Sequence, residues 1–212
     1  MWLFILAFLP LNEELIYSAK FGLMTAGEIK LMYHREVRPQ DNLNHIRCEE
    51  KTKGFFSMIF KIDDWYESLC DSNFATIRFE KKIQEGNYSS HQVVNIVAGR
   101  ATYKNGNVVD VIEGAKDIMS LIYWLRTQEL VPGDTLIVPL HYDEKNYTIK
   151  TPIVSDTVDG EPCVLLVPDL KGIKAFGGDG GLLLYYNKDK LPVLLKIKFL
   201  WGYLEAKLNR GK

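Results

Sequence analysis

The amino-acid sequence predicts a mainly β fold: a single, strongly bent antiparallel sheet, or half-open β-barrel, with one main helix covering its concave side. Three observations lead to this prediction. Apolar and polar residues alternate with a period of two in several short segments, turn dipeptides separate these segments, and only one segment has apolar residues at helical spacing. Period-two alternation is typical of strands that have one buried face and one solvated face.

The predicted strands show this alternation most clearly in four places. The residues expected to share a buried face are Ile29, Leu31 and Tyr33; Ile77, Phe79, Lys81 and Ile83; Tyr147, Ile149 and Thr151; and Leu195, Ile197 and Phe199. Asn105-Gly106 and Asp159-Gly160 each separate two such segments and predict tight hairpins. A further turn is predicted at 25–27 (TAG), and a flexible loop is predicted at 177–181 (GGDGG).

One segment, 117–128, is predicted to be the main helix. Asp117 is a suitable N-cap, and apolar residues follow it at helical spacing: Ile118, Leu121, Ile122 and Leu125. The sequence VPG at 131–133 is expected to end it. The apolar stretch 55–60 fits either a helical turn or a strand, and the sequence alone leaves that choice open.

The chain of 212 residues is long enough for one domain with a sizeable core. We expect a single β-rich domain over 13–212. Residues 1–12 begin with a short apolar run, WLFILAFLPL, which is shorter than the roughly 20 residues of a transmembrane helix. Its length is typical of a signal-peptide core. The prediction is therefore a signal-peptide remnant, with a first buried strand as the alternative, and no transmembrane span.

The charge balance argues against a nucleic-acid partner. The chain has 26 basic and 27 acidic residues, giving a net charge of −1, whereas nucleic-acid binding calls for a basic excess. Lysines and one arginine gather in 188–212 and could meet anionic lipid or an acidic partner, although a solvated strand face explains them equally well. The three cysteines follow no metal-binding spacing, so no metal and no cofactor is expected.

No motif predicts catalysis. The sequence lacks a serine elbow, a phosphate loop and a zinc-protease motif, and it has four isolated histidines: His34, His45, His91 and His141. We therefore expect no catalytic residue and no enzyme activity. An uncharacterised hydrolase would require Asp64, Arg126 and a histidine to line one cleft.

Three residues are candidates for ligand binding: Tyr123, Arg126 and Asp64. Tyr123 and Arg126 continue a three-residue spacing along the helix that begins with Asp117 and Ser120, and an Arg fork suits a carboxylate or phosphate. The alternative is structural, with Asp117 as the cap and Arg126 paired with a nearby acid. Asp64 belongs to an acidic stretch at 63–71, for which turn and edge roles, or a pairing with Arg126, are the alternatives.

An ordered set of segments resembles a bacterial family known as domain of unknown function 3108. The segments are LIYSAKFGLMTAGE, FKIDDWYESLCD, IQEGNY, DIMSLIYWLR and LLLYYNKDKLPVLLKIKFLWGYLEAKL, which together extend over nearly the whole chain. The resemblance implies an exported envelope protein of bacteria, with a shape similar to the half-open barrels of the periplasmic lipoprotein carriers LolA and LolB. It implies no catalytic residue.

From these observations we expect a non-enzymatic, periplasmic or otherwise exported protein that binds an apolar or amphipathic ligand, such as lipid, in a half-barrel cavity. Consecutive apolar residues at 55–60, 164–167 and 182–184 support this, because both faces of such strands must meet something other than water. The alternative is an envelope assembly or interaction protein with a filled core, which binds a protein partner.

Overall fold

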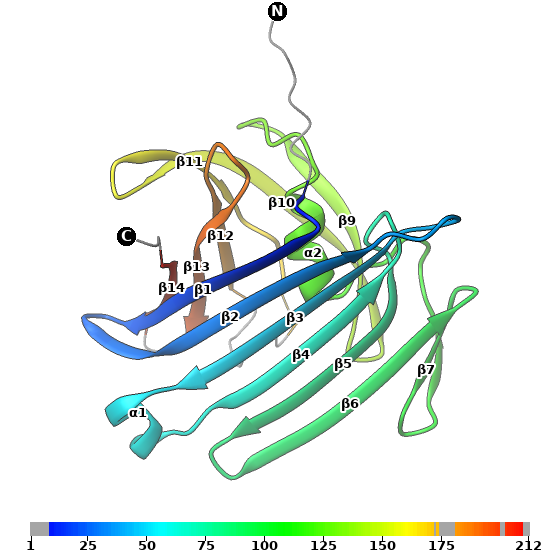
Figure 1. Ribbon diagram of the computed structural model, residues 1–212, viewed down its shortest axis with the longest axis horizontal. Coiled ribbons are helices and arrows are strands. Elements are labelled where there is room, and N and C mark those ends of the chain that lie inside the picture. The colour runs from blue at the N-terminus through cyan, green and yellow to red at the C-terminus, as the bar shows by residue number, and fades with distance from the viewer. Residues whose placement is uncertain (1–8, 172, 174–180, 200–201, 210–212) are drawn as a thin grey trace, which may run out of the picture.

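The computed structural model describes residues 9–171, 173, 181–199 and 202–209. The strands form one antiparallel sheet that bends round into a half-open barrel, with a helix on its concave side (Figure 1). The predicted fold class is confirmed.

The sheet has fourteen described strands, and two described helices accompany it. The strands are β1 (Asn12–Phe21), β2 (Met24–Glu36), β3 (Leu43–Thr52), β4 (Asp63–Cys70), β5 (Thr76–Glu85), β6 (Tyr88–Val97), β7 (Arg100–Tyr103), β8 (Val108–Asp110), β9 (Thr135–Tyr142), β10 (Lys145–Val158), β11 (Glu161–Leu166), β12 (Leu182–Tyr186), β13 (Pro192–Phe199) and β14 (Gly202–Leu208). The helices are α1 (Gly54–Ile59) and α2 (Ile118–Leu125).

The strand order is β8-β7-β6-β5-β4-β3-β2-β1-β14-β13-β12-β11-β10-β9. Neighbours in the sheet are therefore neighbours in the chain, except where β1 pairs with β14, for example at Tyr17 and Leu208. The two edges, β8 and β9, come from the middle of the chain. Part of the β9 edge is covered by the segment before α2, because Lys116 forms a parallel bridge with Leu140.

Helix α2 occupies the concave side of the sheet and is mostly apolar around its circumference, as expected of a helix with almost no solvated face. Every residue from Ile118 to Tyr123 is buried, and so is Leu125. The helix packs against β3, β4 and β9. Asp117 caps it as predicted, but the helix ends at Leu125, earlier than the predicted 128, because the backbone tightens into a turn with Arg126 as the C-cap.

The stretch 55–60, for which helix and strand were both possible, contributes to the short helix α1 in the connection between β3 and β4. Its start needs a glycine, since Gly54 has φ of +58°. The turn predicted at 25–27 is wrong: the chain turns at Gly22 and Leu23, and 25–27 lies within β2. Gly27 serves instead for close approach, because a Cβ there would lie 2.2 Å from the Lys51 carbonyl oxygen.

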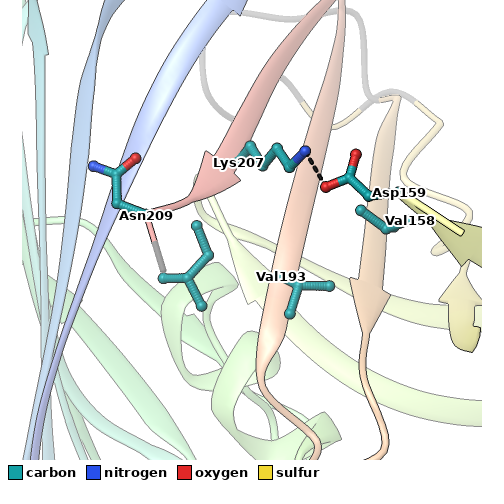
Figure 2. A pocket seen from close by; sticks show the side chains of 6 residues that line it. Val158, Asp159, Val193, Lys207 and Asn209 are labelled. Carbon is teal, nitrogen blue, oxygen red and sulfur yellow. Dashed lines mark ion pairs between the residues drawn. The ribbon is translucent and has the colours of Figure 1, made fainter. Parts of the chain in front are cut away.

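The other predicted hairpins are confirmed, and one of them covers part of the outer face of the sheet. Asn105-Gly106 joins β7 to β8, and Asp159-Gly160 joins β10 to β11. The tip of the second hairpin lies against β13 and β14, where the Lys207 ammonium pairs with the Asp159 carboxylate beside a shallow pocket (Figure 2). A second apolar cluster forms there from Val158, Cys163, Tyr185, Val193 and Leu194.

This outer cluster accounts for two of the consecutive apolar runs. Leu165 and Leu183 pack against it from one face of the sheet, while Leu166 and Leu184 belong to the main core on the other. The runs at 164–167 and 182–184 therefore meet apolar neighbours within the chain itself. The third run, at 55–60, does not (see below).

Residues 1–8 and 174–180 lie outside the described residues, and with them most of the predicted signal-peptide remnant and of the predicted loop at 177–181. Leu9 is the first described residue, and its side chain is buried. Within the described part of the chain, neither helix has the length and apolar character needed to cross a membrane.

Candidate functional site

The start of α2 is fastened by a buried carboxylate. One oxygen of Asp117 accepts hydrogen bonds from the backbone N–H groups of Met119 (2.8 Å) and Ser120 (2.9 Å). The other accepts from the hydroxyls of Ser68 (2.5 Å) and Thr76 (2.7 Å), on β4 and β5. Burial raises the pKa of Asp117, while these four donors favour its charged form. The predicted cap is confirmed, and it also joins the helix to the sheet.

The other end of α2 is fastened by a buried ion pair. The Arg126 guanidinium binds both carboxylate oxygens of Glu13 on β1, with Nη2 to Oε1 at 2.9 Å, and its Nε donates to the Lys190 carbonyl at 3.0 Å. The Tyr123 hydroxyl also donates to Glu13, at 3.4 Å. Arg126 and Glu13 have side-chain exposures of only 3% and 11%. The structure thus brings two predicted site residues together, but their polar groups already have partners.

Asp64 lies in a different part of the interior, so the suggested pairing with Arg126 is wrong. Its carboxylate accepts from the Gln84 N–H at 2.7 Å, and it lies opposite Glu50 in the β3–β4 ladder and interacts with Glu85. Burial, and then the nearby Asp64, raise the pKa of Glu50 to about 8; burial also raises the pKa of Asp64 and of Glu85. Three carboxyl groups therefore gather here, part of them protonated at neutral pH.

This acidic cluster does not resemble a metal site. Among the residues that the structure describes, no group of histidine, cysteine and carboxylate side chains is arranged to hold a metal ion. The cysteines Cys48, Cys70 and Cys163 are buried, and no disulfide joins any two of them. Two histidines, His34 and His45, face each other across β2 and β3 with ring centroids 5.9 Å apart.

The fourth histidine belongs to a seam between the two edges of the sheet. The Glu144 N–H donates to the Tyr103 oxygen (2.9 Å), and the Tyr103 hydroxyl lies 2.7 Å from His141 Nε2. His141 Nδ1 lies 2.9 Å from the Asn146 amide oxygen, and the Asn146 amide nitrogen donates to the Asp110 carbonyl (2.7 Å). This geometry suits a neutral imidazole that accepts at Nε2 and donates at Nδ1. Consistently, burial lowers the pKa of His141.

A buried lysine adds a contact from the inner strand β5 to the β9–β10 turn. Lys81 on β5 donates to the Asp143 carboxylate at 2.5 Å and to the Tyr142 hydroxyl at 3.3 Å. Its ammonium also lies 4.4 Å from the centroid of the Tyr142 ring. The alternation in the sequence correctly placed Lys81 on the buried face. Its partner, Asp143 in the β9–β10 turn, could not be predicted, because it lies far away in the sequence.

The most unusual surface is the end of the barrel that carries α1. In an antiparallel meander successive connections alternate between two rims, so the β1–β2, β3–β4 and β5–β6 connections lie at the same rim, and the start of β14 joins them through its pairing with β1. Figure 1 shows α1 and these hairpins along one side of the sheet. We call this surface the α1 rim; its exposed large apolar residues are Leu23, Met24, Phe55, Met58, Ile59, Phe60, Tyr88 and Tyr203.

These side chains are exposed to a degree that folding alone does not explain. Leu23 is fully exposed, Met58 is 84% exposed and Phe55 is 66% exposed, and α1 contains no buried residue. In the described part of the chain, every exposed methionine and aromatic side chain lies on this rim; the exposed apolar residues elsewhere are valine, leucine and isoleucine. Large exposed apolar patches on folded proteins are typical of interaction surfaces.

The fold, the buried polar contacts of α2 and the α1 rim define a β-barrel-like protein. Its interior holds a buried helix, and exposed large apolar side chains gather at one end of the barrel. The chain belongs to the family described as "Protein of unknown function (DUF3108)", whose model matches residues 16–209. The resemblance inferred from the segments in the sequence is therefore confirmed.

A solved structure supports the same fold class. The chain is similar to a crystal structure described as a "Beta-barrel-like Protein of Domain of Unknown Function DUF1849 from Brucella abortus", with a TM-score of 0.60 and 8% sequence identity over 94% of this chain and 95% of that one. At that identity the likeness concerns the fold alone. No curated protein matches the chain.

Proposed function

We propose that this protein is a non-enzymatic binding protein of the bacterial cell envelope, and that it binds apolar or amphipathic material through the α1 rim. The single observation that carries the proposal is the gathering of exposed aromatic, methionine and aliphatic side chains at this rim. The rim takes the place of the half-barrel cavity expected from the sequence, because α2 occupies the concave side and is buried on all faces.

The polar centres favour binding over catalysis. Asp117, Tyr123 and Arg126 are engaged in fastening the helix, and Asp64 lies apart from Arg126 in the acidic cluster. A hydrolytic site would require such groups to converge on one accessible cleft. Export to the periplasm is proposed on the family resemblance and on the apolar N-terminal run, and osmotic-shock fractionation of the native host tests it.

Titration with a fluorescent fatty acid tests the binding surface. The rim variant Leu23→Ser/Met58→Ser/Ile59→Ser replaces exposed side chains only, so it should fold normally. Its matched control, Val37→Ser/Val97→Ser/Val131→Ser, makes the same kind of change at exposed residues away from the α1 rim. Saturable binding that the rim variant loses and the control keeps would support the proposal. Equal binding by all three proteins, or no binding at all, would refute it.

A second candidate, an assembly protein that binds another envelope protein, is favoured by the filled interior. A photo-crosslinking residue at position 58 distinguishes the two. One discrete protein adduct in cells, absent when the same residue is placed at position 37, would favour assembly, whereas adducts to lipid would favour the first proposal.

A further inference from the structure

The shape, residue types and charge of the α1 rim indicate what kind of partner it binds. This inference rests on the function proposed above. The exposed apolar side chains come from three separate connections, from the strand ends beside them and from the start of β14, so they stand at separate places along the rim. A protein partner would have to offer a matching hollow at each place. A lipid bilayer accommodates single protruding side chains without any matching shape, because its interfacial region is fluid.

The residue types also suit the interfacial region of a bilayer. Tyr88 and Tyr203 combine an apolar ring with a polar hydroxyl, which is the property that places tyrosine at the headgroup level of membranes. Phe55, Met58 and Ile59 lie on one short helix with no buried residue, so the helix could enter the interface without uncovering any part of the core. The rim therefore needs no rearrangement to bind.

Lysines surround these apolar side chains. Lys20 precedes the β1–β2 turn, Lys61 follows α1, and Lys198 lies opposite Tyr203 in the β13–β14 ladder; all three are exposed. Among the described residues none of the three has a carboxylate within ion-pair distance. Lys51 and Lys53 are also exposed at this rim, although Glu49, Asp63 and Glu28 pair with them.

Two further turns at this end of the barrel, both within the described residues, are polar and bound the contact on the side beyond β6. The β7–β8 turn offers Asn105 and Asn107, and the β9–β10 turn offers Glu144, which accepts hydrogen bonds from both. The acidic cluster of Glu50, Asp64 and Glu85 lies on the concave side and not among the exposed apolar side chains. In the described part of the chain, the apolar and basic arc thus extends from β14 to β6 and ends before the Tyr103–His141 contact.

We propose that the α1 rim docks onto the surface of a lipid bilayer that contains anionic headgroups, with its apolar side chains in the interfacial region and its lysines against the headgroups. Each basic residue near such a surface adds to the attraction, and salt weakens it. The protein would thus contact the membrane through the α1 rim alone.

Vesicle flotation tests the proposal on the full chain. Wild-type protein should float with vesicles of phosphatidylethanolamine and phosphatidylglycerol, and more weakly with vesicles of phosphatidylcholine alone. The rim variant Leu23→Ser/Met58→Ser/Ile59→Ser should bind both kinds about tenfold less or worse, while Val37→Ser/Val97→Ser/Val131→Ser should bind like wild type. The variant Lys20→Gln/Lys61→Gln/Lys198→Gln should lose only the preference for anionic vesicles.

Two results would overturn the inference: no flotation of the wild type with either vesicle, or undiminished flotation of the rim variant. If the wild type fails to float but still binds the fluorescent fatty acid through the rim, the bilayer is wrong while the proposed function stands. If rim and control variants behave alike in both assays, the proposed function fails as well. Circular dichroism of each variant confirms that it is folded.

Discussion

Replacing Arg126 with methionine should strongly destabilise the protein. Methionine fills much of the volume of the arginine stem but leaves the Glu13 carboxylate buried without the guanidinium that binds both of its oxygens. Removing one partner of a buried pair costs about 3–5 kcal/mol. Because the Glu13 side chain is 11% exposed and keeps the Tyr123 hydroxyl as a donor, we expect the lower end, about 3 kcal/mol.

A double-mutant cycle separates the cost of the stranded charge from that of lost packing. In Glu13→Gln/Arg126→Met no charge is left to bury, so the double variant should be more stable than Arg126→Met alone, by about 1–2 kcal/mol. Arg38→Met serves as the control, because Arg38 and Glu36 form an exposed pair at 2.9 Å, and such pairs contribute little.

Urea unfolding, followed by tryptophan fluorescence and by circular dichroism, measures these differences in the free energy of unfolding. The reasoning is refuted if Arg126→Met unfolds at the same urea concentration as Arg38→Met. It is also refuted if the double variant is no more stable than the single one, because the loss would then come from packing and not from the stranded carboxylate.

Three further predictions concern buried titratable groups. The raised pKa of Glu50 keeps a proton on the folded protein that the unfolded chain releases, so the free energy of unfolding should fall as pH rises from about 4.5 to about 8. In urea unfolding measured over this pH range, Glu50→Gln should flatten the fall. An unchanged slope would show that Glu50 is not the group responsible. His141 has the opposite sign: because its pKa is lowered, stability is lost as pH falls below about 6.5. His141→Gln should remove part of that loss at acid pH. If variant and wild type lose stability in parallel as pH falls, the buried neutral state inferred for His141 is wrong. Cys48, Cys70 and Cys163 are buried, so a thiol reagent should react with them only as fast as the protein unfolds; immediate reaction of the folded protein would show that a thiol is accessible.

The sheet and the main helix could be predicted because their signals are local. Alternation along Ile29, Leu31 and Tyr33 follows from the geometry of a single strand, and Asp117 caps the helix that starts one residue later. The turn predicted at 25–27 was wrong because glycine occurs both where the backbone needs positive φ and where two backbones approach closely. At Gly27 the backbone of β3 comes too close for any Cβ, whereas Gly22 adopts positive φ at the turn that the chain makes.

The partners of the polar residues could not be predicted, because they come from distant parts of the chain. Arg126 was expected to meet a nearby acid, and Glu13, which it binds, is 113 residues away. Likewise, the apolar run at 182–184 indicated a buried second face but not its cover, which is the β10–β11 hairpin. The run at 55–60 is different, because Phe55, Met58 and Ile59 on α1 remain exposed and no other part of the described chain covers them.

The pairing of β1 with β14 has a consequence for how the chain reaches its fold. Strands β1–β8 and β9–β14 can each grow as a series of local hairpins, but the ladder that joins them brings Tyr17 to Leu208 and closes a loop of nearly the full chain. Ribosomal synthesis proceeds from the N-terminus, so the first meander must wait with an unpaired β1 edge until β14 has been made. That edge is a template for mispairing with other chains. A circular permutant that joins the two ends and opens the chain between β8 and α2 would turn this long-range step into a local hairpin, and should refold faster.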